Sequence, residues 1–188
     1  MSIDDREKWN QTYRTRSERL PPSAFVTSLG ALLPASGRAL DVAGGAGRHA
    51  LWLAARGLDT TLADVSEVAL DEAARTAAAR GLRLRTVQAD LDTDPLPAGP
   101  WDVILCSFFL HRPLFDAFPA ALAPGALLVV AHPTRRNLER NPKPGAAFVL
   151  EEGELARLAG GLEVICCDEG WRESGVHEAR LIARRPAK

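Results

Sequence analysis

The chain has 188 residues and a formal net charge of −1 at pH 7, from 23 Lys and Arg against 24 Asp and Glu. This length suits one domain with a sizeable core, and the balanced charge predicts no nucleic acid and no membrane surface as partner. Three cysteines without C-x-x-C spacing indicate a reducing compartment, so we expect a cytoplasmic protein, either a monomer or a homodimer. No apolar run reaches the ~18 residues that a membrane span needs.

In chain order, the first 30 residues form a separate helical segment, and apolar β-rich runs then alternate with segments of helical spacing. In the helical segment, Trp9 and Tyr13 are four residues apart and share one face. The patterns predict strands over 39–43, 58–65, 83–90, 101–109, 126–132, 162–170 and 177–186, and helices over 48–57, 66–81, 114–122 and 151–160. We expect a turn over 123–125 and loops over 91–100 and 133–145.

This alternation predicts an α/β fold, Rossmann-like and doubly wound, with a mostly parallel seven-stranded sheet and helices on both faces. The connection over 171–176 is too short for a crossover, so the final two strands should be antiparallel. We therefore expect a single domain over 1–188, with the Rossmann-like core over 36–188. In such sheets the ligand binds at the carboxyl ends of the strands, near Ala43, Asp64, Asp90, Ser107 and His132.

The stretch ALDVAGGAGRHA, which begins at Ala39, joins the first strand to the first helix of this core. Gly44, Gly45 and Gly47 carry no Cβ, so the backbone can take positive φ angles and a ligand can approach closely. The free N–H groups of the following helix favour a polar or anionic ligand group. The run from Gly45 to Ala50 matches the G-x-G-x-x-A fingerprint of dinucleotide-binding proteins, and an acid, Asp64, follows 19 residues later.

The glycines alone leave the ligand open between a dinucleotide and another nucleotide-like cofactor. Asp41 places a carboxylate two residues before the turn, where it favours a cationic ligand rather than a pyrophosphate. Asp90 adds a third acid at a strand end, and the chain has no Tyr-x-x-x-Lys pair of the kind that reductases use. An NAD(P)-dependent reductase and a non-catalytic cofactor-binding protein stay open as alternatives.

The same residues resemble the class I S-adenosylmethionine-dependent methyltransferases. LDVAGGAGRHALWLA is similar to the first motif of that family, ADVSEVAL to the second, QADL to the third and WDVILCSFFLHRP to the fourth. EKWNQTY resembles the lid segment, which makes residues 1–30 an N-terminal helical lid, and the C-terminal half resembles small bacterial members related to the tellurite-resistance methyltransferases. Ala43 departs from the motif, because the family usually has glycine there. Gly44 stands where cysteine or threonine is common.

The resemblance implies S-adenosyl-L-methionine as cofactor. Asp41 would lie beside the methionine end, Asp64 would hold the ribose hydroxyls, and Asp90 would accept from the adenine amino group. The complete set of cofactor-binding residues that it implies is Trp9, Tyr13, Asp41, Ala43, Gly44, Gly45, Gly47, Asp64, Val65, Asp90, Leu91, Cys106 and Ser107. From the residues alone, Trp9 and Tyr13 can equally pack on the sheet edge. Cys106 reads as a buried apolar residue rather than a nucleophile.

The methyl acceptor is expected to be a small molecule. Methyl transfer needs alignment of the two partners and, for a neutral acceptor, removal of a proton. His111 and His132 follow strand ends and are the catalytic candidates, although satisfied structural roles are as plausible. The substrate-binding candidates are Phe109, Arg112, Glu169 and His177. No metal site is expected.

The fourth strand ends in CSFF rather than in the Asn/Asp-Pro-Pro-Tyr/Phe motif of enzymes that methylate nucleic-acid or protein nitrogens. This difference and the resemblance favour a small soft nucleophile, such as a thiol or a chalcogen oxyanion. Carboxyl, hydroxyl and small-amine acceptors remain open.

Overall fold

A computed structural model describes residues 3–16 and 20–187. One seven-stranded sheet has the order β3-β2-β1-β4-β5-β7-β6. Its strands are β1 (Arg38–Val42), β2 (Asp59–Asp64), β3 (Leu84–Gln88), β4 (Trp101–Ser107), β5 (Leu122–Pro133), β6 (Glu163–Trp171) and β7 (His177–Arg184). Strands β1 to β5 pair in parallel, and β7 is antiparallel to both β5 and β6. The predicted fold class and the antiparallel final pair are confirmed.

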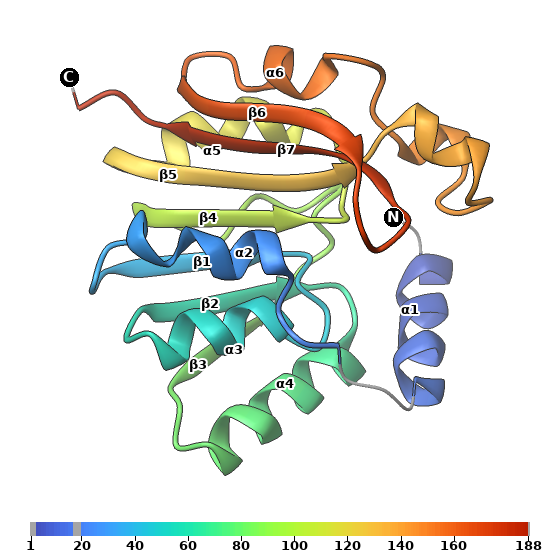
Figure 1. Cartoon of the computed structure of the whole chain (residues 1–188). Helices are drawn as coiled ribbons and strands as arrows, with labels where there is room; N and C mark the ends of the chain where they lie inside the picture. The colour runs from blue at the N-terminus through green and yellow to red at the C-terminus, as the bar shows by residue number, and fades with distance from the viewer. Residues whose placement is uncertain (1–2, 17–19, 188) are drawn as a thin grey trace.

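Helices cover both faces of the sheet (Figure 1). Helices α2 (Ala24–Ser28), α3 (Arg48–Ala55) and α4 (Glu67–Ala79) lie on one face, and α5 (Leu114–Ala121) and α6 (Glu154–Leu158) on the other. Short 3-10 turns, η1 (Leu29–Ala31), η2 (Arg135–Glu139) and η3 (Ala146–Phe148), complete the connections. None of the described helices is both long enough and apolar enough to cross a membrane.

Helix α1 (Ile3–Thr15) stands apart from these layers, beside the carboxyl ends of the parallel strands (Figure 1). The helical segment predicted over 1–30 is thus divided between α1 at the strand ends and α2 on the sheet face. Residues 1–2 and 17–19 of that segment lie outside the described residues. Such a placement lets α1 contact whatever binds at the strand ends.

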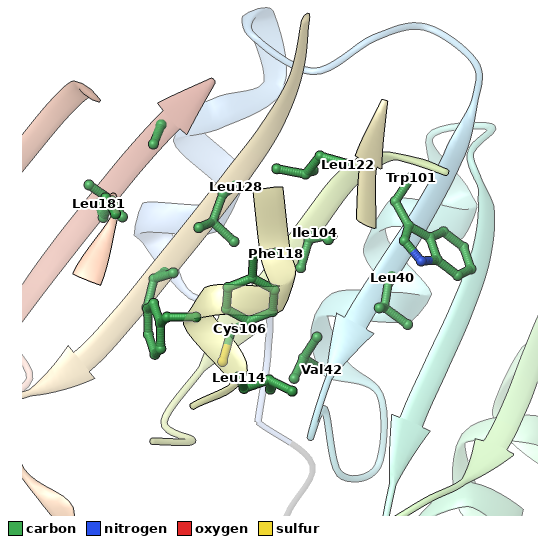
Figure 2. Packing of buried hydrophobic residues seen from close by; sticks show 14 of the residues in the cluster. Leu40, Val42, Trp101, Ile104, Cys106, Leu114, Phe118, Leu122, Leu128 and Leu181 are labelled. Carbon is green, nitrogen blue, oxygen red and sulfur yellow. The ribbon is translucent and has the colours of Figure 1, made fainter. Parts of the chain in front are cut away.

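The main core fills the space between the sheet and helix α5 (Figure 2). Leu40 and Val42 of β1 point into it because they alternate with residues that face the opposite layer. Phe118 of α5 packs there with no exposed surface, a burial that stabilises the fold by ~2–3 kcal/mol. The alternating apolar positions of β1 therefore hold the strand in register, and with it the turn that follows.

Most element boundaries lie within two residues of the sequence prediction, and the differences at β4 and β5 have clear physical causes. β4 ends at Ser107 rather than at 109, because Phe108 has a φ of 61° and leaves the extended conformation. β5 begins at Leu122, four residues early, because Leu122 pairs with Trp101 across a register shift. The turn expected over 123–125 is therefore part of the strand, where the Gly125 N–H donates to the carbonyl of Arg185, directly after the end of β7.

The helix expected over 151–160 and the loop expected over 133–145 also differ. Helix α6 spans only Glu154–Leu158, since Gly153 before it has a left-handed φ of 65° and is not helical. The loop contains η2, which lies next to the start of β7. These segments have weak periodicity, and their structure depends on contacts with β6 and β7.

Candidate cofactor and acceptor site

The glycine turn between β1 and α3 is left-handed at Gly45 and Gly47, as its sequence predicted, whereas the third left-handed residue is Ala43 and not Gly44. The φ angles are 51° at Ala43, 59° at Gly45 and 76° at Gly47. Gly45 and Gly47 adopt them without strain, whereas the Cβ of Ala43 costs ~1–2 kcal/mol in this region. The turn thus presents backbone, with few side-chain atoms, at the carboxyl end of β1.

Asp41 lies on β1 beneath this turn and is completely buried. Its Oδ2 accepts a hydrogen bond of 2.9 Å from the Ala50 N–H of α3. Its Oδ1 is buried and has no hydrogen-bond partner among the described residues. Burial raises the pKa of this carboxyl group to about 7, against a lowering by the Ala50 hydrogen bond and by the nearby Arg48. A buried carboxylate oxygen without a partner is the feature expected where a ligand supplies the missing donor or positive charge.

Asp64 ends β2 and fastens the turn to the next helix. Its Oδ2 accepts from the Gly45 N–H at 2.8 Å and its Oδ1 from the Ser66 N–H at 2.9 Å. Burial raises the pKa of the carboxyl group, and these backbone hydrogen bonds oppose the rise. Each carboxylate oxygen has a second lone pair, so both can also accept from ligand hydroxyls. Ser66 caps α4 by accepting from the Ala69 N–H.

Helix α1 brings Tyr13 to the same turn. The Tyr13 hydroxyl approaches Gly45 so closely that a Cβ added there would lie 2.0 Å from it. Burial, with the charge of Asp64, raises the pKa of Tyr13 to about 12. Trp9 lies beside Tyr13 with ring centroids 6.2 Å apart and is 37 % exposed. Both residues therefore lie on the side of α1 that faces the strand ends.

The other predicted cofactor residues lie at neighbouring strand ends. Val65 is buried directly after β2, and Leu91 is buried after β3. Asp90 lies between β3 and a turn in which its own N–H donates to the Asp94 carboxylate at 2.8 Å. Ser107 ends β4 and is partly buried. This clustering follows from the parallel strands, but their contacts with a cofactor remain a prediction.

Cys106 is buried in β4, and its thiol donates to the Phe109 carbonyl at 3.5 Å. Burial, with a smaller contribution from the charge of Asp41, raises the pKa of this thiol far above its ordinary value. These features agree with the apolar, non-nucleophilic reading of Cys106.

We expect Ellman's reagent at pH 8 to label Cys106 at least 100-fold more slowly than Cys166, which is exposed on β6. The measurement is peptide mapping of the labelled protein over time, with urea-unfolded protein as the control in which the two rates converge. Equal labelling of the two cysteines in the folded protein would contradict the burial of Cys106.

The predicted acceptor residues lie in three parts of the structure: near α6 (Arg112, Glu169 and His132), beside Thr134 (His177) and beside Asp92 (His111). Arg112 pairs with Glu154 of α6 at 2.5 Å, and Glu169 of β6 accepts from the Gly153 N–H at 2.9 Å. His132 lies close to the first of these contacts, and its Nε2 is 2.8 Å from the Phe148 carbonyl. The structure thus brings Arg112 and His132 together where α6 packs on the sheet.

His132 and His177 are both buried, whereas His111 is partly exposed. Burial lowers the pKa of His132 to about 4, and its Nδ1 has no partner among the described residues. His177 Nδ1 lies 2.6 Å from the Thr134 hydroxyl. His111 Nδ1 lies 3.1 Å from Asp92 Oδ1, in the turn that follows Asp90. Their roles toward an acceptor remain predictions, as does that of Phe109, which is partly buried after β4.

Sequence reasoning missed three residues at this site. Asn10 of α1 is buried, and its Oδ1 accepts from the Ser66 hydroxyl at 2.8 Å. Arg48 opens α3 directly after the glycine turn, and Arg16 follows α1. Arg48 could have been recognised in the sequence, because the helix dipole disfavours a cation at a helix N-terminus and such a residue therefore suggests a functional role. No group of three or more His, Cys, Asp or Glu side chains in the described part of the chain is arranged to hold a metal.

Comparison with known proteins agrees with this geometry. Residues 39–125, from β1 to the start of β5, match a family described as a methyltransferase domain. By this match, residues 39–125 resemble a methyltransferase domain. The predicted recognition of this family is confirmed, and the domain carries the glycine turn together with Asp41, Asp64 and Asp90.

The chain is also similar to a curated protein and to solved structures. A demethylmenaquinone methyltransferase of Thermus thermophilus is 36 % identical over 127 residues, which cover 64 % of this chain and 54 % of the relative. The match thus spans about half the length of that relative. The structure of TehB from Haemophilus influenzae has a TM-score of 0.75 at 18 % identity and covers 96 % of this chain and 66 % of its own.

A second solved structure is the magnesium protoporphyrin IX methyltransferase of Synechocystis PCC 6803 with bound S-adenosylhomocysteine. Its TM-score is 0.74 at 16 % identity, over 97 % of this chain and 98 % of its own. At these identities the two structures support the methyltransferase fold.

Proposed function

We propose that this protein binds S-adenosyl-L-methionine at the carboxyl ends of β1 to β4 and transfers its methyl group to a small-molecule acceptor. The observation that carries the proposal is the buried, unpartnered Oδ1 of Asp41 beneath a turn with left-handed backbone. A cationic, amino-bearing cofactor supplies both a donor and a positive charge to that oxygen. A pyrophosphate supplies neither, which disfavours the reductase alternative.

The residues of the chain fit such a cofactor. Asp64 can accept from two ribose hydroxyls while it keeps its bonds to the backbone, at ~1.5–3 kcal/mol for each charge-assisted bond. Tyr13 and Trp9 are placed to cover the bound molecule and exclude water. When bound, the cofactor supplies a methyl group on a sulfonium, which passes to an acceptor lone pair as the carbon–sulfur bond breaks and S-adenosylhomocysteine remains.

The acceptor proposed is a small soft nucleophile, a thiol or a chalcogen oxyanion. Support comes from the end of β4, where the residues after Ser107 are phenylalanines rather than the Pro-Pro motif that holds a planar nitrogen. For a neutral acceptor, the proton must leave as the new bond forms. His132 is neutral at physiological pH because its pKa is about 4, and its Nδ1, which has no partner among the described residues, is a candidate base, although a weak one because burial disfavours its protonated form. His111 is the other candidate base.

The test is parallel calorimetric titration with S-adenosylhomocysteine, S-adenosylmethionine and NADH. We expect micromolar binding of the first two and none of NADH. Asp64→Asn should weaken S-adenosylhomocysteine binding at least tenfold, since it removes a charge-assisted acceptor. Asp71→Asn, an exposed carboxylate on α4, is the matched control and should bind as the wild type does. Binding of NADH alone would overturn the proposal in favour of a reductase.

A further inference from the structure

Two arginines lie beside the tyrosine that covers the glycine turn. The guanidinium carbon of Arg16 lies 5.3 Å from the centroid of the Tyr13 ring. Arg48 is close enough that its charge, like that of Arg16, acts on the Tyr13 hydroxyl. That hydroxyl stands over Gly45. Two cationic groups therefore lie around one phenol above the turn.

The position of Arg48 is unfavourable in the ligand-free protein. It is the first residue of α3, where the helix dipole repels a cation. Partial burial lowers the pKa of its guanidinium, and the like charge of Arg16 lowers it further. A cation that is half desolvated, at a helix N-terminus and near a second cation, costs free energy unless an anion joins it.

The carboxylates near Arg48 only partly balance its charge. Asp41 and Glu178 both attract it electrostatically. Asp41, however, is directed to the Ala50 N–H and is only partly ionised at neutral pH, since its pKa is about 7. Glu178 already forms ion pairs with two other arginines, because its Oε1 lies 2.7 Å from Arg180 Nε and 3.7 Å from Arg172 Nε. Within the described residues, Arg48 makes neither a side-chain hydrogen bond nor an ion pair shorter than 4.0 Å.

We propose that Arg48, assisted by Arg16, receives an anionic group of the methyl acceptor. The inference rests on the proposed function and narrows the acceptor to a molecule that carries a carboxylate or another oxyanion. A guanidinium presents a planar fork of N–H donors that matches two oxygens of such a group. The Tyr13 hydroxyl remains protonated at neutral pH and can donate a further hydrogen bond. An acceptor bound there lies beside the glycine turn, where the methyl group is expected.

The carboxylate of the cofactor's methionine part is a second source of the same chemistry, so the experiment separates the two. The first arm follows the side-chain Nε–Hε signals of Arg48 and Arg16 in 15N-labelled protein saturated with S-adenosylhomocysteine. Thioglycolate, an anionic thiol, and 2-mercaptoethanol, a neutral thiol of similar size, are titrated in turn. We expect saturable shifts of both signals with thioglycolate only. Absence of saturable shifts, or equal shifts with the neutral thiol, overturns the inference.

Variants test whether Arg48 is the residue that binds thioglycolate. Arg48→Gln should raise the dissociation constant of thioglycolate at least tenfold, and Arg48→Lys should raise it less, because lysine keeps the charge without the fork. Arg75→Gln, which removes an exposed arginine of α4, should leave it unchanged. An unchanged constant in Arg48→Gln overturns the inference, and circular dichroism of each variant shows that the fold is retained.

The second arm compares S-adenosylhomocysteine with 5′-methylthioadenosine, which lacks the amino-acid part. We expect Arg48→Gln to bind both within threefold of the wild type. If it loses affinity for S-adenosylhomocysteine alone, Arg48 holds the cofactor carboxylate, and the acceptor assignment is overturned. If the wild type does not bind S-adenosylhomocysteine, the proposed function fails. The thioglycolate titration on unliganded protein then still decides whether the two arginines bind an anion.

Discussion

Asp41→Asn is expected to weaken S-adenosylhomocysteine binding at least tenfold at pH 8 and, at the same pH, to raise the free energy of unfolding. The loss of affinity follows because asparagine removes the negative charge at the unpartnered Oδ1. The gain in stability follows because the wild-type protein buries that charge completely. The measurements are calorimetric titration and urea unfolding of the wild type and the variant.

The pH dependence of the free energy of unfolding shows whether ionised Asp41 stabilises or destabilises the folded protein. The pKa of Asp41 rises from 3.8 in the unfolded chain to about 7 in the folded protein. Between these values the folded state holds a proton that the unfolded state has released, so this group's contribution to stability falls as pH rises from about 4 to 7. Its cost reaches on the order of 4 kcal/mol above pH 7. The stability gain of Asp41→Asn should therefore be larger at pH 8 than at pH 5. An equal gain at both pH values would contradict the titration of Asp41, and Asp71→Asn is again the matched control.

Gly44→Ala is expected to lower the free energy of unfolding by about 1–3 kcal/mol and to weaken cofactor binding at least tenfold. A Cβ at this position would lie 2.4 Å from Asp41 Oδ2 and 2.5 Å from Leu62 Cδ1. Leu62 and Asp41 are both fully buried, so the added Cβ can be accommodated only if the Asp41 carboxylate shifts together with the packing around it. The variant thus changes the geometry of the acid without removing it.

The same two measurements check this result. Gly145→Ala is the control, because an added Cβ there meets open space and the residue has no positive φ. It should leave both stability and binding within error of the wild type. If Gly44→Ala binds S-adenosylhomocysteine as tightly as the wild type, Asp41 does not contact the cofactor.

Much of the fold and the centre of the site could be predicted because both depend on local patterns. Short, mostly apolar runs specify β1 and β4, and the short connection after Trp171 makes β7 antiparallel to β6. Parallel strands then bring their carboxyl ends together. This explains why Asp64 accepts from the Gly45 N–H in the glycine turn while Asp41, on the neighbouring strand, accepts from the Ala50 N–H in the first turn of the helix that follows.

The rest depends on contacts between distant segments, which periodicity does not reveal. The early start of β5 is due to the pairing of Leu122 with Trp101. Arg112 was predicted as a substrate residue from its place after β4, yet it pairs with Glu154, 42 residues later. Asn10 gave no signal at all, because a lone asparagine on a polar helix is ordinary until a buried partner such as Ser66 is known.

The buried hydrogen bond between Asn10 and Ser66 has a consequence for ligand binding. Asp64 accepts from the Ser66 N–H, and the Ser66 hydroxyl donates to Asn10, so the acid proposed to bind the cofactor and the helix proposed to cover it are linked through one serine. Lifting α1 leaves buried polar groups unsatisfied, and a ligand on Asp64 steadies the serine that anchors the helix. Thermodynamic coupling is reciprocal: the factor by which a bound ligand favours the packed position of α1 is also the factor by which packing of α1 raises the affinity for the ligand. The position of α1 and the binding of a ligand at Asp64 should therefore be coupled, and we expect the occupied protein to resist proteolysis near its N-terminus better than the empty one.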